Sequence, residues 1–251
     1  MDSNIQTASV PATSRRGLLR AAVAGSATAG SLLAFGSAFP AAAAPAGPAA
    51  EDTGDRPTTP EQALRRLAEG NRRWRAYRQQ HPNESPSVRT RLTQGQHPFA
   101  IVLGCVDSRV PPELVFDQGL GDLLTVRSAG EVLDEAVLGS IAYGVLELHI
   151  PLVLVLGHQS CGAVGAAVHA DETGERLPAH IQYLADQIRP SIDRGADGEA
   201  RVAATIDAHA RRTRERLAAE ADLAGAIAAG RLAVAAARYD LRDQRVRLLT
   251  P

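Results

Sequence analysis

The sequence predicts an α/β fold in which a mostly parallel central sheet is flanked by helices. Two short apolar runs bounded by turn residues, 98–104 (PFAIVLG) and 151–157 (PLVLVLG), have the composition of strands buried on both faces. Segments with the helical spacing of apolar residues separate these runs. Strands that alternate with helices form parallel sheets, and such sheets place functional sites at the carboxyl ends of their strands.

The first expected element is an N-terminal helical arm over residues 59–80. Pro60 suits a first helical turn, and Leu64, Leu67 and Trp74 fall near helical spacing. Many arginines lie on the other face of this helix. An amphipathic helix of this kind is expected to pack on the body of the domain or on a second subunit.

The remaining elements continue the alternation of strands and helices. After the strand at 98–104 we expect a strand over 122–127 and a helix over 132–148, which ends before Pro151. After the strand at 151–157 we expect helices over 163–170, 178–190 and 201–229. Two strands, over 232–239 and 245–249, close the chain, with 240–244 as their connection.

Residues 1–44 have the architecture of a twin-arginine export signal. The segment 13–20 (TSRRGLLR) precedes an uncharged stretch over 21–39, and small residues suited to signal-peptidase cleavage follow. A membrane-spanning helix is the alternative, but the stretch is weakly hydrophobic and carries three glycines. We therefore expect an extracellular, periplasmic or cell-envelope protein without a stable membrane anchor after cleavage.

The domain is expected over residues 59–251, after a flexible linker over 45–58 that is rich in Pro, Ala, Gly and acidic residues. About 190 residues suffice for one domain with a sizeable core. The formal net charge is −1 and no basic stripe is interleaved with aromatic residues, so nucleic acid is not an expected partner. The chain contains no lysine, which excludes Schiff-base and lysine general-base mechanisms.

Two polar patches follow the two buried strands and contain the only two cysteines of the chain. One patch is 105–109 (CVDSR), and the other is 158–161 (HQSC). A zinc site with two cysteines and one histidine can be catalytic, because three protein ligands leave a fourth position for water or substrate. The patches therefore indicate a zinc site at the ends of two strands.

A structural disulfide is the obvious alternative for two cysteines in an exported protein. Three features favour the metal: His158 lies three residues before Cys161, Asp107 and Arg109 stand beside Cys105, and twin-arginine export carries folded proteins that can load metal in a reducing cytoplasm. The absence of a Cys-x-x-Cys motif argues against a redox enzyme. A non-catalytic exported domain, with a disulfide or a closed structural zinc, remains open.

Asp107 has two possible roles beside a zinc ion. It can accept a hydrogen bond from hydroxide on the metal while Arg109 holds the carboxylate, or it can become a fourth ligand that closes the site. The sequence leaves both states open. Gly162 begins a helix directly after Cys161, where free backbone N–H groups favour a thiolate and can bind an anion.

The paired motifs Cys-x-Asp-x-Arg and Gly-His-x-x-Cys-Gly resemble those of the β-class carbonic anhydrases. The similarity covers most of residues 60–250, including the segments 69–72, 110–114, 116–122 and 126–130. This resemblance implies a lyase that hydrates CO2 reversibly to bicarbonate and a proton, by attack of zinc-bound hydroxide. It also implies four parallel strands with an added edge strand, an N-terminal helix that embraces a neighbouring subunit, and a homodimer or homotetramer with its active site near the dimer interface.

Matching the family's motif residue by residue implies that Cys105, His158 and Cys161 are the zinc ligands. Asp107 and Arg109 become the pair that orients hydroxide, with Asp107 as the fourth ligand in a closed state. The substrate-binding residues would be Gln96, Tyr143 and Gly162, with Leu124 in the apolar pocket wall. Gln96 could instead be an ordinary loop residue, Tyr143 a helix core residue and Gly162 a turn requirement.

The sequence departs from the family pattern at two positions. Leu124 stands where many members carry phenylalanine, and Glu131 stands where asparagine is frequent. These departures put the subgroup in doubt but not the reaction. A hydrolase for CS2 or COS on the same scaffold would share every ligand. The remaining histidines are candidates for proton transfer: His81, His97, His149, His169, His180 and His209.

Overall fold

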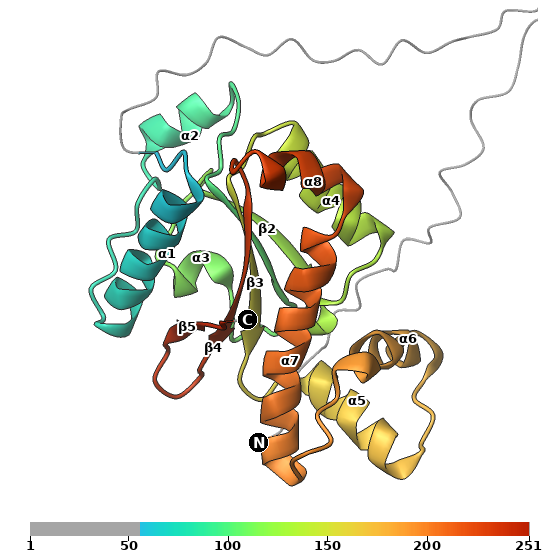
Figure 1. The fold of residues 1–251 in the computed structure, drawn as a ribbon. Coiled ribbons are helices and arrows are strands. Elements are labelled where there is room, and N and C mark those ends of the chain that lie inside the picture. The colour runs from blue at the N-terminus through green and yellow to red at the C-terminus, as the bar shows by residue number, and fades with distance from the viewer. Residues whose placement is uncertain (1–55, 251) are drawn as a thin grey trace, which may run out of the picture. The chain divides into compact units, whose positions relative to one another are not determined.

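The computed structural model describes residues 56–250, so the predicted export signal and most of the predicted linker lie outside the described residues. A single five-stranded sheet runs through this part of the chain in the order β2-β1-β3-β4-β5 (Figure 1). Its strands are β1 (Ala100–Cys105), β2 (Leu123–Ser128), β3 (Leu152–His158), β4 (Ala233–Tyr239) and β5 (Val246–Leu248). The first four are parallel, and β5 pairs antiparallel with β4 at the edge. The predicted fold class and the added edge strand are confirmed.

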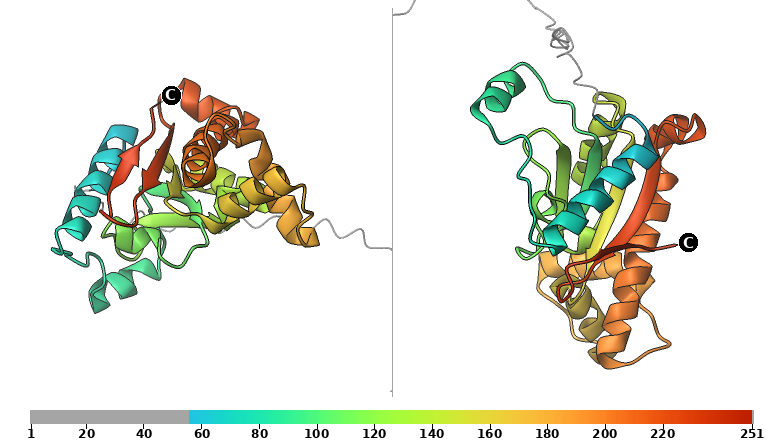
Figure 2. Two further views of the ribbon diagram at one scale, coloured as in Figure 1. Left: turned by 90° about the horizontal axis from the view of Figure 1, so that it is seen from below. Right: turned by 90° about the vertical axis from the view of Figure 1, so that its left-hand side faces the viewer.

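The helices and short 3₁₀ turns of the described chain alternate with these strands. They are α1 (Pro60–Arg75), α2 (Pro86–Leu92), α3 (Pro112–Val115), η1 (Ala129–Glu131), α4 (Glu135–Leu146), α5 (Gly162–Thr173), α6 (Ala179–Ile188), η2 (Arg189–Ser191), α7 (Gly198–Ala218) and α8 (Ala221–Ala228). Figures 1 and 2 show α1 and α3 on one face of the sheet and α4, α7 and α8 on the other. Two apolar cores, one on each face, contain side chains of these same helices.

The central strands β1 and β3 are buried at every residue, whereas every residue of β2 is only partly buried. The difference is explained by the order of the strands, because β1 and β3 have a neighbour on each side and β2 is an edge strand. Continuous apolar runs are the signature of strands covered on both faces. This is why the two runs in the sequence correspond to the two central strands.

Helix α1 packs against the sheet of its own chain. Thr59 and Gln62 form a capping box at its start, with Pro60 in the first turn. Ala63 and Leu67 are buried in the core on that face. The helix ends at Arg75 rather than near residue 80, because the chain turns left-handed at Tyr77, where φ is 53°. Helix α1, in the predicted arm, therefore belongs to the body of the domain.

Close contacts fix the position of α1. A side chain at Gly70 would bring its Cβ within 1.6 Å of the Phe116 carbonyl oxygen, so only glycine allows this approach. The Asn71 side chain donates to the carbonyls of Val115 and Gln244, at 3.1 and 3.0 Å, and accepts from the Val246 backbone at 3.0 Å. The Asn71 amide thus ties α1 to both α3 and β5.

The predicted helical region over 201–229 is divided into α7 and α8. Glu220 has an extended backbone (φ −66°, ψ 131°) and caps α8. No glycine or proline marks this break in the sequence, which explains why a continuous helix was expected. The short helices α2 and α3 were not predicted, and α2 buries none of its residues and stands away from the sheet in Figure 2.

A third apolar core covers the carboxyl ends of β1 and β3. It joins Cys105 and Cys161 to side chains of α5, α6 and α7, among them Val164, Ile188 and Ile206. This core encloses the ends of both strands that the two polar patches follow. Among residues 56–250, no helix combines the length and apolar character needed to cross a membrane.

Candidate metal centre

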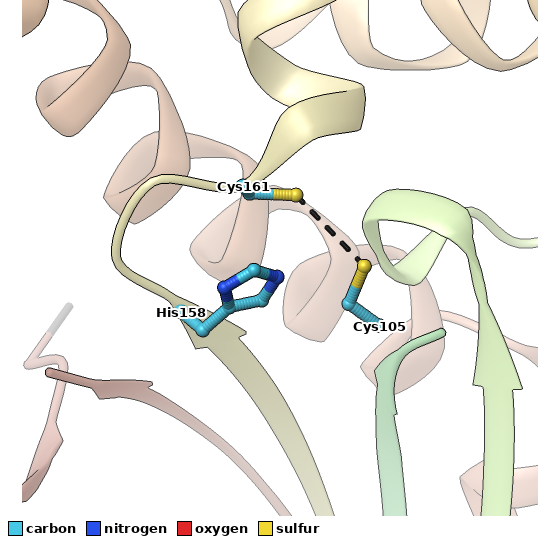
Figure 3. Close-up of side chains that lie close together, drawn as sticks. All are labelled: Cys105, His158 and Cys161. Carbon is cyan, nitrogen blue, oxygen red and sulfur yellow. Dashed lines mark hydrogen bonds between the residues drawn. The ribbon is translucent and has the colours of Figure 1, made fainter. Parts of the chain in front are cut away.

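The fold brings the two polar patches together at one edge of the sheet. Cys105 is the last residue of β1, His158 is the last residue of β3, and these strands are parallel neighbours. Cys161 caps α5 directly after β3. Their three ligand atoms all lie within 4.8 Å of one another, and all three residues are buried. Figure 3 shows the two sulfur atoms and the imidazole ring converging on one place.

The separation of the two sulfur atoms suits a metal ion. Both cysteines are free thiols, and their Sγ atoms lie 3.9 Å apart (Figure 3). A disulfide requires a separation of about 2.05 Å. Two sulfurs bound at about 2.3 Å to a tetrahedral zinc ion would lie about 3.8 Å apart. The structure therefore favours the metal site over the disulfide alternative.

His158 presents a nitrogen that is ready to bind metal. Its Nδ1 atom lies 2.9 Å from the Gln159 carbonyl, and because a carbonyl only accepts hydrogen bonds, Nδ1 must carry the proton. The Nε2 atom then has a free lone pair. This atom is buried and has no hydrogen-bond partner among the described residues. A histidine held through one nitrogen with the other one free is the usual arrangement of a metal ligand.

The thiol pair has an uneven affinity for protons. The hydrogen bond from Cys161 lowers the pKa of Cys105 to about 4, and the same bond raises the pKa of the Cys161 thiol. The backbone N–H of Gly130 also donates to the Cys105 sulfur, at 3.4 Å. The pair therefore loses its first proton more readily than its second, and a bound cation would displace the second proton as well.

Asp107 and Arg109 form a two-pronged ion pair beside the ligand group. The guanidinium donates from Nε to Oδ1 at 2.9 Å and from Nη2 to Oδ2 at 2.7 Å. These bonds lower the pKa of Asp107 to about 2, so the carboxylate is ionised at neutral pH. Arg109 Nη2 also donates to the carbonyl of Ser160 at 3.3 Å, which links the two patches.

The carboxylate of Asp107 lies near the ligand group without joining it. Its Oδ2 atom is 3.9 Å from His158 Nε2, but the ligand group comprises only Cys105, His158 and Cys161. Asp107 is therefore bound to Arg109 in this structure.

Arg127 supports the loop beside the candidate site and was not singled out by the sequence. From the carboxyl end of the neighbouring strand β2, its guanidinium donates to three backbone carbonyls at and after the end of β1: Cys105 and Asp107, each at 2.7 Å, and Val110 at 3.4 Å. The guanidinium thus holds the loop that carries Asp107 and Arg109. The available signal was an arginine within a mostly apolar strand next to β1.

Glu131, one of the two departures from the family pattern, is buried behind the thiols. Its backbone is left-handed, with φ of 50°, and its Oε1 atom is buried with no hydrogen-bond partner among the described residues. Burial, reinforced by the charge of Cys105, raises the pKa of the Glu131 carboxyl well above its ordinary value. The neutral acid is therefore the favoured form in the folded protein.

The predicted substrate-binding residues divide into two groups. The first group is Gly162 alone, the exposed first residue of α5 at the metal end of the sheet. Its φ is not positive, so the backbone does not require a glycine there. Gln96 is exposed and precedes β1, and Leu124 pairs with Ile101 near the start of that strand. Tyr143 is half-exposed on α4.

The second group, Gln96, Leu124 and Tyr143, lies far from Cys105, His158 and Cys161 of the same chain. Tyr143 is adjacent to Gly144, which packs closely against Leu124 and Ile101. Gln96, Leu124 and Tyr143 therefore all belong to the amino end of the sheet. The six residues of β1 span about 16 Å, which separates this end from Cys105. Within one chain, the structure does not bring these three residues to the metal centre.

The six candidate proton-transfer histidines also differ in exposure. His209 is buried, and both of its ring nitrogens have hydrogen-bond partners. It therefore does not fit the predicted role of a shuttle to solvent. The other five candidates are exposed: His81, His97, His149, His169 and His180.

The fold and the site together define an α/β protein with a candidate Cys2His metal centre at the carboxyl ends of its central strands. The model of the carbonic anhydrase family matches residues 100–246. Carbonic anhydrase 2 of Mycobacterium tuberculosis is 44% identical over 190 residues, covering 75% of this chain and 92% of that protein. A carbonic anhydrase of Mycolicibacterium smegmatis is 42% identical over 193 residues, covering 76% and 94%.

Solved structures show the same fold at lower sequence identity. A tetrameric β-carbonic anhydrase of the ascomycete Sordaria macrospora superimposes with a TM-score of 0.61 at 21% identity, covering 75% of this chain and 97% of that one. The β-carbonic anhydrase of Coccomyxa gives a TM-score of 0.59 at 23% identity, covering 74% and 86%. The chain belongs to the carbonic anhydrase family and has the fold of its β class.

Proposed function

We propose that this protein is a zinc enzyme that hydrates CO2 reversibly to bicarbonate and a proton. The observation that carries the proposal is the buried group of Cys105, His158 and Cys161, whose ligand atoms lie within 4.8 Å of one another. The relatives that bear the name carbonic anhydrase match this chain over three quarters of its length, at 42 to 44% identity, which supports the same activity.

The donor set fits zinc. Two sulfurs and one imidazole nitrogen suit Zn²⁺, and three protein ligands leave one position open for chemistry. Zinc, when bound there, would supply hydroxide near neutral pH, as is established for the zinc centres of carbonic anhydrases. His158 would bind through Nε2, because its Nδ1 atom is hydrogen-bonded to the Gln159 carbonyl.

Asp107 and Arg109 orient the nucleophile. Arg109 lowers the pKa of the Asp107 carboxyl to about 2, so the carboxylate is ionised at neutral pH. It can therefore accept a hydrogen bond from the nucleophile. The fork of Arg109 fixes the direction of the carboxylate, and Arg127 fixes the backbone that carries both residues. The first N–H groups of α5, beginning at Gly162, face the metal end and suit an anionic product.

The proposed enzyme acts as a homodimer or homotetramer. Gln96, Leu124 and Tyr143 lie at the amino end of the sheet, so a substrate-binding role requires that they serve the metal centre of a second copy. The half-buried strand β2, which is an edge strand in this chain, supports an association at that side. The related structure from Sordaria macrospora is described as tetrameric.

Export by the twin-arginine route is part of the proposal and rests on residues 1–44 alone. The pair Arg15-Arg16 precedes an uncharged stretch and small residues, as an export signal requires. Changing both arginines to lysine should retain the protein inside the cell. Secretion that continues unchanged in this variant would refute the twin-arginine route.

Metal analysis combined with a CO2-hydration assay tests the central proposal. Protein purified without added metal should contain one zinc per chain and hydrate CO2 well above the buffer rate. A metal-free protein without such activity overturns the proposal, and zinc without activity points to a closed structural site. Parallel assays with COS and CS2 distinguish the hydrolase alternative, which predicts faster turnover of those compounds than of CO2.

A further inference from the structure

We propose that His209, on α7, is a positioning residue of the metal centre: it fixes the turn at Gly130 whose N–H donates to the Cys105 sulfur. This inference rests on the proposed function only in requiring that Cys105, His158 and Cys161 bind a metal ion. His209 lies more than a hundred residues from Cys105 in the sequence and is not part of the ligand group.

The turn after β2 has an unusual backbone. Gly130 and Glu131 are both left-handed, with φ of 68° and 50°. Residues with a side chain rarely adopt a left-handed backbone, because the Cβ atom clashes with the main chain. The conformation is therefore unfavourable at Glu131 and tolerated at Gly130. At Gly130 a Cβ would also come within 3.0 Å of Ile188 Cδ1 and 3.1 Å of Ala163 Cβ. Such a turn persists only where its surroundings hold it in place.

His209 holds this turn through a direct hydrogen bond. Its Nε2 atom lies 2.7 Å from the Gly130 carbonyl oxygen, which only accepts, so Nε2 carries the proton. The Nδ1 atom is then the acceptor, and the Ser191 hydroxyl lies 3.2 Å from it and donates. His209 is only 3% exposed, and burial lowers its pKa to about 4. The ring is therefore neutral at physiological pH, in a single tautomer.

Gly130 connects this histidine to the metal ligand. Its carbonyl accepts from His209, while its own N–H donates to Cys105 Sγ at 3.4 Å. A hydrogen bond to a thiolate draws charge from the sulfur and directs its lone pairs, and bonds of this kind tune the affinity of a site for its metal. Without the imidazole, the buried Gly130 carbonyl loses its partner and the left-handed turn loses its support. The N–H would then move away from the sulfur.

Three segments far apart in the sequence therefore act on one thiolate. Ser191 in η2 orients the imidazole, His209 in α7 holds the turn, and Gly130 in η1 donates to the sulfur. The helical layer that covers the metal end of the sheet thereby contributes to the chemistry of the site as well as to its burial. Neither Ser191 nor His209 needs to touch the metal or the substrate for this effect.

Replacing His209 in the metal-loaded protein tests the inference. His209→Leu removes the donor, whereas His209→Gln keeps an N–H that can reach the Gly130 carbonyl. The rate of zinc release to a chelator should rise on the order of tenfold in His209→Leu and return toward the wild-type rate in His209→Gln. The sulfur-to-metal charge-transfer band of the cobalt-substituted protein should shift in His209→Leu and be restored in His209→Gln.

Thr205→Val is the matched control. Thr205 is another buried polar residue of α7, and its hydroxyl accepts from the Asp193 backbone at 3.1 Å, without any contact to Gly130 in the hydrogen-bond network. This variant should lower the stability of the fold while leaving zinc release and the cobalt spectrum unchanged. Equal acceleration of release in Thr205→Val and His209→Leu would show a general loss of stability and overturn the inference.

Other outcomes are equally decisive. Unchanged zinc release and an unchanged cobalt band in folded His209→Leu overturn the proposed positioning role. If His209→Leu does not fold, Ser191→Ala takes its place: it leaves Nδ1 without a donor and should accelerate release, and an unaltered rate refutes the role. A wild-type protein that binds neither zinc nor cobalt refutes the proposed function instead, so the two failures are distinguishable.

Discussion

The two strand ends that meet at the metal centre differ in what they present. At the end of β3, the His158 side chain is fully buried and Cys161 is 2% exposed. At the end of β1, Cys105 is buried as well, but it is followed by Asp107 and Arg109, whose side chains are 16% and 53% exposed. The first end therefore presents buried candidate ligands, whereas the second presents a buried candidate ligand together with charged side chains that reach solvent.

The difference arises from the segment that comes after each strand. After β3 the chain enters α5 within four residues, so the helix and its apolar core cover the ligands. After β1 an irregular loop leads to the short helix α3, and a loop can present polar side chains that a buried helix end cannot. Such a loop needs support from outside, and Arg127 gives it through three carbonyls.

A change at a ligand should have the largest effect, and the same effect at either strand end. Cys105→Ser should abolish zinc binding and all activity above background, because a hydroxyl is a poor replacement for a thiolate ligand. Metal analysis of the purified variant checks this. Full zinc content in Cys105→Ser would refute the assignment of this cysteine as a ligand.

A change beyond the ligand should separate the two functions of the β1 end. Asp107→Asn should keep zinc but lower kcat on the order of a hundredfold, because the amide carries no charge and no longer forms the ion pair with Arg109. Zinc content and kcat measured on the same preparation check the separation. Ser108→Ala is the control, because Ser108 is exposed and lies between Asp107 and Arg109 in the sequence. This variant should keep both its zinc content and its kcat.

Loosening the loop should have a smaller effect on the same end. Arg127→Gln removes most of the bonds to the Cys105, Asp107 and Val110 carbonyls and should lower kcat about tenfold while zinc remains bound. Arg238→Gln is the control, since this arginine of β4 bonds instead to Ala203 and Asp207 of α7. An equal loss of kcat in both variants would mean that Arg127 supports the sheet rather than the loop.

The last prediction concerns the pH dependence of stability and His209, which bonds to the turn behind Cys105. Burial lowers the pKa of His209 from 6.5 to about 4, so its neutral form stabilises the fold above pH 6.5, and this contribution is lost as the pH falls toward 4. By that shift, the loss amounts to at most about 3 kcal/mol. The pKa of Asp107 is lowered from 3.8 to about 2. The stability that its ionised carboxylate contributes is therefore lost only under more acidic conditions, from about pH 4 downward.

The difference in unfolding free energy between wild type and His209→Gln measures this contribution. Because other acid-sensitive groups are common to both proteins, their effects largely cancel in the difference. Between pH 7 and 5 the wild type should lose stability faster than the variant. Parallel curves for the two proteins over this range would show that the imidazole does not stay neutral in the fold.

The elements that the sequence predicted well are those determined by local composition. The run at 98–104 became β1 (Ala100–Cys105) and the run at 151–157 became β3 (Leu152–His158), because a strand buried on both faces needs apolar residues throughout. The place of the candidate ligands in the fold was predictable for the same reason, since each patch directly follows such a run. The break between α7 and α8 was not, because no helix-breaking residue marks it.

The features that the sequence did not reveal depend on contacts between distant segments. Arg127 reaches carbonyls about twenty residues earlier in the chain, and His209 reaches the Gly130 carbonyl 79 residues earlier. Nothing in the local sequence of an arginine in a strand or a histidine in a helix identifies its partner. Glu131 was noticed as a departure, but its burial and left-handed backbone became apparent only in the folded chain.

The parallel pairing of β1 and β3 also sets the order in which the protein can be assembled. Their register joins Ile101 to Val153 and Gly104 to Leu156, and this pairing alone places Cys105 next to His158. In the unfolded chain these ligands are separated by more than fifty residues, and closing so long a loop is among the slower events of folding. The complete group of three candidate ligands therefore forms only after the central pair of strands, and a metal ion that needs all three would bind late in the maturation of the protein.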